Sequence, residues 1–106
     1  MQRAHLRVVK PIDRMQAAEE AMRQGEWDQA HRHIDIGYAA GDISLSDRNL
    51  TRTLISWRQE CVQAMLDIYT VDDVSLPTLR RRLLAAGFDE YVIDWVIFDY
   101  RTAAGV

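Results

Sequence analysis

The amino-acid sequence predicts an all-α protein, a compact bundle of about five helices around a long central helix at about residues 45–69. Three observations lead to this prediction. Apolar residues recur with helical periodicity along most of the chain. Glycines at positions 25, 41 and 87 separate the periodic segments, as glycines do at helix ends. The one strand-like run, residues 6–9, has no second run to pair with.

The length of 106 residues is that of one helical domain. We expect a lead-in arm over residues 1–10, a helical hairpin over 11–40, the central helix over 45–69 and a C-terminal helical hairpin over 76–103. The apolar arc of the central helix spans roughly 160°, against the ~100° of an ordinary surface helix. We therefore expect the two hairpins to cover opposite sides of the central helix.

The first hairpin is predicted from two periodic segments on either side of Gly25, at about residues 11–24 and 26–40. Pro11 is tolerated in the first turn of a helix, where its missing N–H is not needed. The apolar sides of the two helices carry Ile12, Met15, Ala18 and Met22, and then Trp27, Ala30, His31, Ile34 and Tyr38.

Four residues of this hairpin follow a known pattern. Gly25 stands where a turn glycine is expected, Trp27 is an aromatic two places later, Ala30 is a small residue at a helix crossing, and Ile34 is a large residue one turn on. Residues 17–41 therefore resemble one tetratricopeptide-type helical hairpin, which implies two antiparallel helices. One copy does not make a stacked array, which needs about three repeats.

The central helix is predicted to start after Ser44, whose side chain is a favourable cap. Its main apolar stripe is Leu50, Leu54, Trp57, Cys61, Met65 and Ile68, and a second stripe beside it is Ile55, Val62 and Tyr69. We expect Trp57 to be buried, with a cost of about 3–5 kcal/mol for truncation to Ala. Arg58 lies inside the apolar arc. Its guanidinium either reaches water along an apolar stem or pairs with a carboxylate, for which Asp99 is the internal candidate.

The C-terminal hairpin is predicted from helices at about residues 76–86 and 89–103, with Ser75 and Asp89 as N-caps and Gly87 between them. The first of these helices carries three consecutive arginines, Arg80, Arg81 and Arg82. They fan over roughly 200° of the helix surface. We interpret them as a solvated face, with contact to an anion or nucleic acid as the alternative.

A longer pattern covers the C-terminal third. An apolar helix end and a polar break are followed by Ser75, Leu79, Arg81, Leu83, Gly87, Phe88, Asp89, Glu90, Ile93 and Val96. The segment resembles one three-helix unit of the RecX family. RecX-like proteins are repeats of such units and bind a recombinase filament, so the resemblance implies a local three-helix geometry and a role near a recombinase. Trp95, Phe98 and Tyr100 are more apolar than that pattern requires.

The last helix is apolar almost all the way round. Val92, Ile93, Val96 and Tyr100 form one side, and Tyr91, Trp95 and Phe98 form another. Because a terminal helix in a small domain normally buries one face, we expect the second side to be partly exposed. Exposed aromatic residues are typical of interfaces, so we expect Tyr91, Trp95 and Phe98 to contact a partner protein or a second copy, with Asp94 and Arg101 at the rim. The alternative is that the central helix and the N-terminal arm wrap this helix on both sides.

Composition and motifs exclude several classes of function. Apolar residues make up 48% of the chain and charged residues 27%, as in globular proteins. The net charge of −3 opposes general nucleic-acid affinity. No apolar run is long enough to span a membrane and no signal peptide opens the chain, so we expect a cytoplasmic protein.

No residue pattern indicates catalysis or metal binding. The sequence has no Gly-rich phosphate loop, no Cys-x-x-Cys and no His-Glu-x-x-His motif. Cys61 is the single cysteine and lies on the apolar stripe, so we expect a packed core thiol. His31 and His33 are two residues apart and point in different directions on a helix, so they cannot hold one metal together. We expect no enzymatic activity, no cofactor and no metal.

These features favour a non-enzymatic, protein-binding regulator or inhibitor that covers a surface of a partner complex. Small proteins that phages and mobile elements use to disable a host defence complex, anti-CRISPR proteins among them, have this character. Two alternatives remain open. One is a nucleic-acid-associated regulator, such as a RecX-like recombinase modulator, that uses the three arginines and the N-terminal arm. The other is a self-associating structural or assembly subunit.

Overall fold

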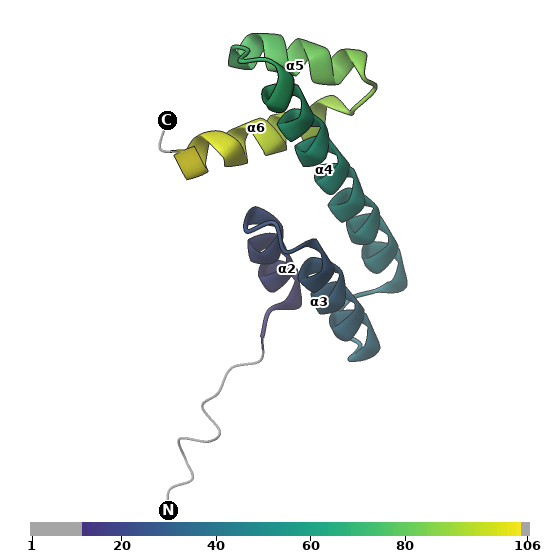
Figure 1. Cartoon of the computed structure of the whole chain (residues 1–106). Helices are drawn as coiled ribbons and strands as arrows, with labels where there is room; N and C mark the ends of the chain where they lie inside the picture. Colours follow the sequence, from purple (N-terminus) through teal and green to yellow (C-terminus); the bar gives the residue numbers. More distant parts are fainter. Residues whose placement is uncertain (1–11, 105–106) are drawn as a thin grey trace, which may run out of the picture.

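The computed structural model describes residues 12–104, which form five α-helices and no strand. The helices are α2 (Arg14–Arg23), α3 (Trp27–Ala39), α4 (Leu45–Val71), α5 (Leu76–Ala85) and α6 (Glu90–Ala104) (Figure 1). The predicted all-α bundle around a long central helix is confirmed. The expected lead-in arm at residues 1–10 and the expected helix start at Pro11 lie outside the described residues.

Side-chain caps set the starts of α2 and α4. The Asp13 carboxylate accepts a hydrogen bond from the Gln16 N–H at 3.2 Å, so α2 begins at Arg14. The Ser44 hydroxyl accepts from the Asp47 N–H at 3.1 Å, as the sequence predicts. Each cap satisfies a backbone donor that has no partner inside the helix.

The two hairpins pack one after the other along α4. Its 27 residues make a helix about 40 Å long, and the helices of the hairpins are about half that length. The hairpin of α2 and α3 therefore covers the first half of α4, and the hairpin of α5 and α6 covers the second half (Figure 1). The residues that α4 buries, Ile55, Arg58, Cys61 and Met65, fall within an arc of about 120°. The expectation that the hairpins cover opposite sides of the central helix is wrong.

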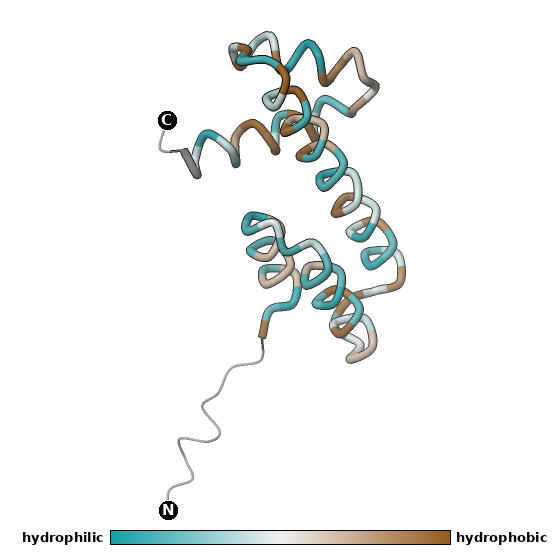
Figure 2. The backbone as a smooth tube through the Cα atoms, viewed as in Figure 1, coloured by the Kyte–Doolittle hydropathy of each residue, from teal (hydrophilic) through white to brown (hydrophobic). Residues whose placement is uncertain are grey.

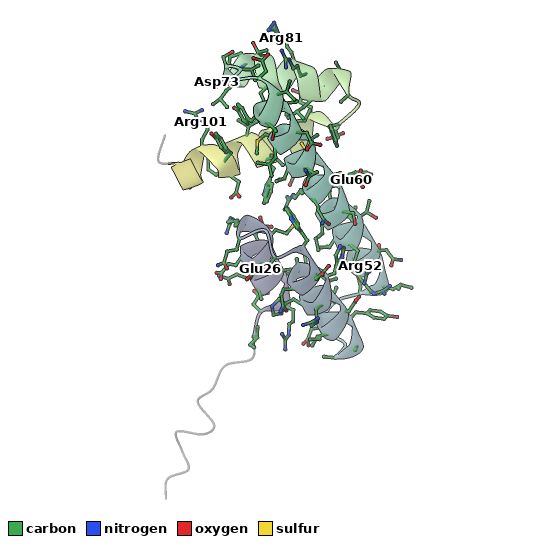
Figure 3. All side chains as sticks on the ribbon, in the orientation of Figure 1. Glu26, Arg52, Glu60, Asp73, Arg81 and Arg101 are labelled. Carbon is green, nitrogen blue, oxygen red and sulfur yellow. The ribbon has the colours of Figure 1, made fainter. Side chains whose placement is uncertain are left out.

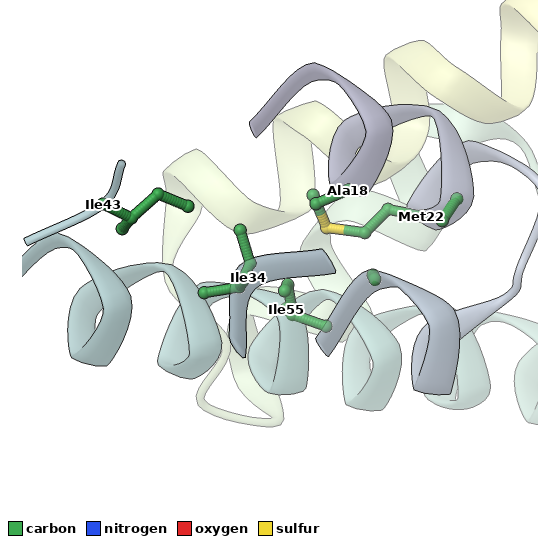
Figure 4. Packing of buried hydrophobic residues seen from close by; sticks show 7 residues of the cluster. Ala18, Met22, Ile34, Ile43 and Ile55 are labelled. Atoms are coloured by element: carbon green, nitrogen blue, oxygen red, sulfur yellow. The ribbon is translucent and has the colours of Figure 1, made fainter. Parts of the chain in front are cut away.

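Each hairpin forms its own core against α4. The first cluster contains Ala18, Ala21, Met22, Ala30, Ile34, Ile43 and Ile55 (Figure 4). The second contains Cys61, Met65, Leu79, Leu83, Val92, Ile93 and Val96. Each fully buried Ile or Leu contributes about 1.5–3 kcal/mol. Trp95 packs against both clusters and so joins the two halves of the molecule.

The body is thin, and this leaves apolar side chains in contact with water. Its extents are 61 × 31 × 18 Å, and a helix with its side chains is about 10–12 Å wide. Hydrophobic residues occur along the whole length of α4 and in the middle of α6 (Figure 2). In the first half of α4 the hairpin docks on Ile55, from the second predicted stripe, and of the main stripe there Leu54 is partly buried while Leu50 is 59% exposed. Trp57 is 47% exposed, so the prediction that it is buried is wrong.

Candidate functional site

A polar junction joins three helices at the centre of the molecule. Arg58 of α4 is 5% exposed, and its Nη1 donates to the Glu19 carboxylate of α2 at 3.3 Å. The centre of its guanidinium lies 3.9 Å from the middle of the Trp95 ring of α6. The Trp95 Nε1–H donates to the same Glu19 carboxylate at 3.1 Å. The interpretation of Arg58 as reaching water is therefore wrong, and its carboxylate partner is Glu19 rather than Asp99.

Asp99 lies beside this junction. Its carboxylate is 3.7 Å from the Arg23 Nε of α2, and Arg23 is also 3.7 Å from Glu19. Burial raises the pKa of the Asp99 carboxyl. Together with the Glu19 contacts, this pair ties α6 to α2 although the two helices are far apart in sequence.

The structure separates the three aromatic residues expected on the outer side of α6. Tyr91 is 60% exposed and Phe98 is 70% exposed. They lie two turns apart, on the same side of the helix. Trp95 lies roughly 40–60° round the helix from them and is half-buried, because Glu19 and Arg58 hold its ring at the junction. The described residues thus leave an exposed aromatic patch, and it consists of Tyr91 and Phe98.

Ion pairs occupy most of the charged residues singled out in the C-terminal hairpin. Arg80 donates to Asp94 at 2.9 Å and to Glu90 at 2.7 Å, and its hydrogen bond to Asp94 lowers the pKa of that carboxyl. Arg82 donates to Asp72 at 3.1 Å. These contacts place Asp94 at the polar edge of α6, next to α5. They also neutralise two of the three arginines that the sequence offered as anion contacts.

The third of these arginines, Arg81, and Arg101 of α6 are solvent-facing. Arg81 is exposed and donates to the Thr78 hydroxyl at 3.0 Å. Arg101 is exposed in the last turns of α6 (Figure 3). Arg81 lies on α5 and Arg101 near the end of α6, and neither takes part in an ion pair among the described residues of this hairpin.

A groove crosses α4 at Trp57, a feature that sequence reasoning missed. A hollow of about 500 Å³ is lined by Trp57, Glu60, Ala86, Gly87, Phe88, Asp89 and Val92. A shallower hollow of about 310 Å³ shares Trp57 and Glu60 and extends to His31 and Arg52. We call these adjoining hollows the Trp57 groove. The one available signal was the position of Trp57 at the border between the apolar arc and the polar side of the helix.

Arg52 and His31 lie at the far end of the groove. Arg52 donates to Asp35, and this hydrogen bond lowers the pKa of the Asp35 carboxyl. Desolvation lowers the pKa of His31, with a further contribution from the Arg52 charge. The Nδ1 of His31 is buried without a hydrogen-bond partner.

Three other features of the described residues bear on function: possible metal ligands, the apolar character of the helices and the Cys61 thiol. In residues 12–104 there is no group of three His, Cys, Asp or Glu side chains arranged to hold a metal ion. None of the helices in that range combines the length and the apolar character needed to cross a membrane. Cys61 is fully buried, as expected, and burial raises the pKa of its thiol to about 11.

No protein-family model, curated protein or solved structure matches this chain. The surface of the described residues includes the exposed rings of Tyr91 and Phe98 and the Trp57 groove.

Proposed function

We propose that this protein is a non-enzymatic, protein-binding regulator or inhibitor that covers a surface of a partner complex. The observation that carries the proposal is the exposure of Tyr91 and Phe98 on the outer side of α6. Large exposed aromatic residues are the side chains that most often anchor protein–protein interfaces. Isolated apolar residues are ordinary on a protein surface, but Tyr91 and Phe98 place two large exposed rings on the same side of one helix.

The opposite side of α6 supports this role. Val92, Ile93 and Val96 are buried in the second core cluster, so the helix is held firmly while it presents the two rings. A preorganised surface loses less conformational entropy when it binds. Asp94, paired with Arg80, lies at the polar edge of the same helix, and an apolar centre with a polar rim is the usual composition of an interface.

In its more specific form, the proposal is an inhibitor that a phage or another mobile element directs against a host defence complex. Such a protein acts by steric cover and needs no catalytic group. A structural subunit that associates with itself through the same patch is the competing function, and the oligomeric state of the pure protein separates the two.

A Tyr91→Ala, Phe98→Ala double variant tests the proposal. Both side chains are largely exposed, so we expect the free energy of unfolding to change by less than about 1 kcal/mol. Capture from a lysate of the source cells, followed by mass spectrometry, should recover a partner with the natural protein and lose it with the variant. The matched control is Leu66→Ala, because Leu66 is an exposed apolar residue on α4.

Two results would contradict the proposal. The first is a partner that binds the double variant as well as it binds the natural protein. The second is a dimer of the pure natural protein, seen by light scattering, that the double variant abolishes; this result would assign the patch to self-association.

A further inference from the structure

The Trp57 groove combines an exposed aromatic ring with carboxylates that have no cationic partner in the described chain. Trp57 and Glu60 are one helical turn apart on α4, and Asp89 faces the same 500 Å³ hollow from the start of α6. Within residues 12–104, no ion pair involves Glu60 or Asp89, and no guanidinium lies over the Trp57 ring. One Asp89 oxygen accepts the Tyr91 N–H at 2.8 Å, as a helix cap.

The junction at the centre of the molecule shows how an aromatic ring and a carboxylate of this protein hold a guanidinium together. There, a Trp ring, a Glu carboxylate and an Arg guanidinium meet: Arg58 stacks on Trp95 and pairs with Glu19. The groove holds Trp57 and Glu60 within one lining, and no guanidinium of the described residues lies over the Trp57 ring. An aromatic face attracts a cation through its quadrupole, and a nearby carboxylate adds a charge-assisted hydrogen bond.

We propose that the Trp57 groove receives an arginine side chain from an extended segment of a partner protein. The guanidinium stacks on Trp57 and donates to Glu60, with Asp89 completing the negative rim. This inference rests on the proposed role in protein binding, but it concerns a different surface from Tyr91 and Phe98, so the two can fail separately.

The neighbouring groups are compatible with a cationic guest. Arg52, at the far end of the groove, is held by Asp35 and is not directed at Glu60 by any contact. Burial lowers the pKa of His31, so its imidazole is neutral near pH 7 and does not repel a guanidinium. Glu60 lines the groove, is exposed, and extends outward from α4 (Figure 3).

The chemistry of the groove lining favours arginine over lysine. A planar guanidinium can stack on an indole and donate to a carboxylate at the same time, whereas an ammonium is a compact and strongly hydrated charge. Phe88 and Val92 add apolar wall for the aliphatic stem. A hollow of about 500 Å³ also falls within the range of about 300–1,000 Å³ that is usual for binding pockets, so it accommodates the backbone that carries the arginine.

The test uses the three indole N–H signals of Trp27, Trp57 and Trp95 in ¹H–¹⁵N NMR spectra of the full chain. The probe is acetyl-Gly-Arg-Gly-amide, and the comparison peptide carries citrulline, a neutral isostere of arginine. We expect a saturable shift of the Trp57 indole signal with the arginine peptide, a smaller one with a lysine peptide and none with the citrulline peptide. Trp95, already hydrogen-bonded to Glu19, should not shift.

Variants complete the test. Glu60→Gln should weaken binding of the arginine peptide by about two- to fivefold, the range of a solvent-exposed charge contact. Glu20→Gln makes the same change of charge at an exposed position on α2 and should leave binding unchanged. The inference is overturned if the Trp57 signal does not shift saturably, if citrulline shifts it equally, or if the two Glu variants behave alike. Loss of the partner on changing Tyr91 and Phe98 has no bearing on any of these results.

Discussion

The indole of Trp95 donates a hydrogen bond to the Glu19 carboxylate at 3.1 Å, across 76 positions of the sequence. The same carboxylate pairs with the buried guanidinium of Arg58. One acidic side chain of α2 thus satisfies a donor on α6 and a charge on α4. Among the described residues, the two apolar clusters share only the Trp95 ring, which packs against both. The junction therefore helps to fix the position of the first hairpin relative to the second.

Glu19→Ala should therefore destabilise the protein well beyond an ordinary surface change. It leaves the Arg58 charge buried without its carboxylate and the Trp95 N–H without its acceptor. Breaking a fully buried ion pair costs about 3–5 kcal/mol. Because the Glu19 side chain is 31% exposed, we expect a loss of about 2–3 kcal/mol in the free energy of unfolding, measured by urea denaturation followed by circular dichroism.

Two further variants check this account of the junction. Glu20→Ala, one position away on the exposed side of α2, should change stability by less than about 0.5 kcal/mol. Combining Glu19→Gln with Arg58→Met should give a more stable protein than Glu19→Gln alone, since the second change removes the unpaired charge. Equal losses for Glu19→Ala and Glu20→Ala would show that the ion pair contributes nothing.

The variants Trp57→Ala and Ile55→Ala should differ in stability, because they truncate residues on the two different apolar stripes of α4. Ile55 is fully buried, so its truncation should cost about 2–5 kcal/mol. Nearly half of the Trp57 surface is already in water, so we expect its truncation to cost about half of the value for a fully buried Trp, about 1.5–2.5 kcal/mol. Chemical denaturation of both variants measures the difference. A larger loss for Trp57→Ala would mean that the main predicted stripe is covered after all.

The environments of Trp57 and Trp95 show which parts of the fold could be predicted from the sequence. The positions of the helices and the Ser44, Ser75 and Asp89 caps follow from local rules, because propensity and capping depend on neighbours in the chain. Periodicity also identifies both tryptophans as residues on apolar helix sides. It does not say which side another helix will cover, because that depends on where the hairpins dock and on their length relative to α4.

Of the candidate site, the sequence predicts the features that lie on one helix but not those that two or more helices form together. Tyr91 and Phe98 could be placed on one side of α6 from their seven-residue spacing, and their exposure follows from burial of Val92, Ile93 and Val96. The pairing of Arg58 with Glu19 links residues on helices that have no local relation. The Trp57 groove has walls from α4 and from the turn before α6, so it exists only once the second hairpin has docked.

Cys61 should react very slowly with thiol reagents in the folded protein. Its side chain is fully buried, and burial raises the pKa of the thiol from 9.0 to about 11. The thiolate is the reactive form, and a rise of two units lowers its population about 100-fold at a given pH. We expect modification by iodoacetamide at pH 8 to be limited by unfolding and to accelerate sharply in urea. Rapid modification of the native protein would contradict the buried position of Cys61.

Acidification from pH 7.5 to 5.5 should destabilise the protein through His31. Burial lowers the pKa of His31 in the folded state, the Arg52 charge lowers it further, and Asp35 and Asp28 oppose this only in part. In the unfolded chain the imidazole titrates near its ordinary pKa of about 6.5. Between that value and the lowered folded pKa, the unfolded state binds more protons, so the free energy of unfolding falls as the pH falls.

The His31→Gln variant isolates this contribution. Glutamine does not titrate, so the loss of stability between pH 7.5 and 5.5 should be smaller in the variant than in the natural protein, when both are measured by urea denaturation at the two pH values. Comparing each protein with itself across pH removes the cost of the substitution, which is the same at both values. If the two proteins lost stability equally over this interval, the buried Nδ1 of His31 would have to be protonated as readily in the folded state as in the unfolded chain, and the neutral imidazole assigned to the end of the Trp57 groove would be wrong.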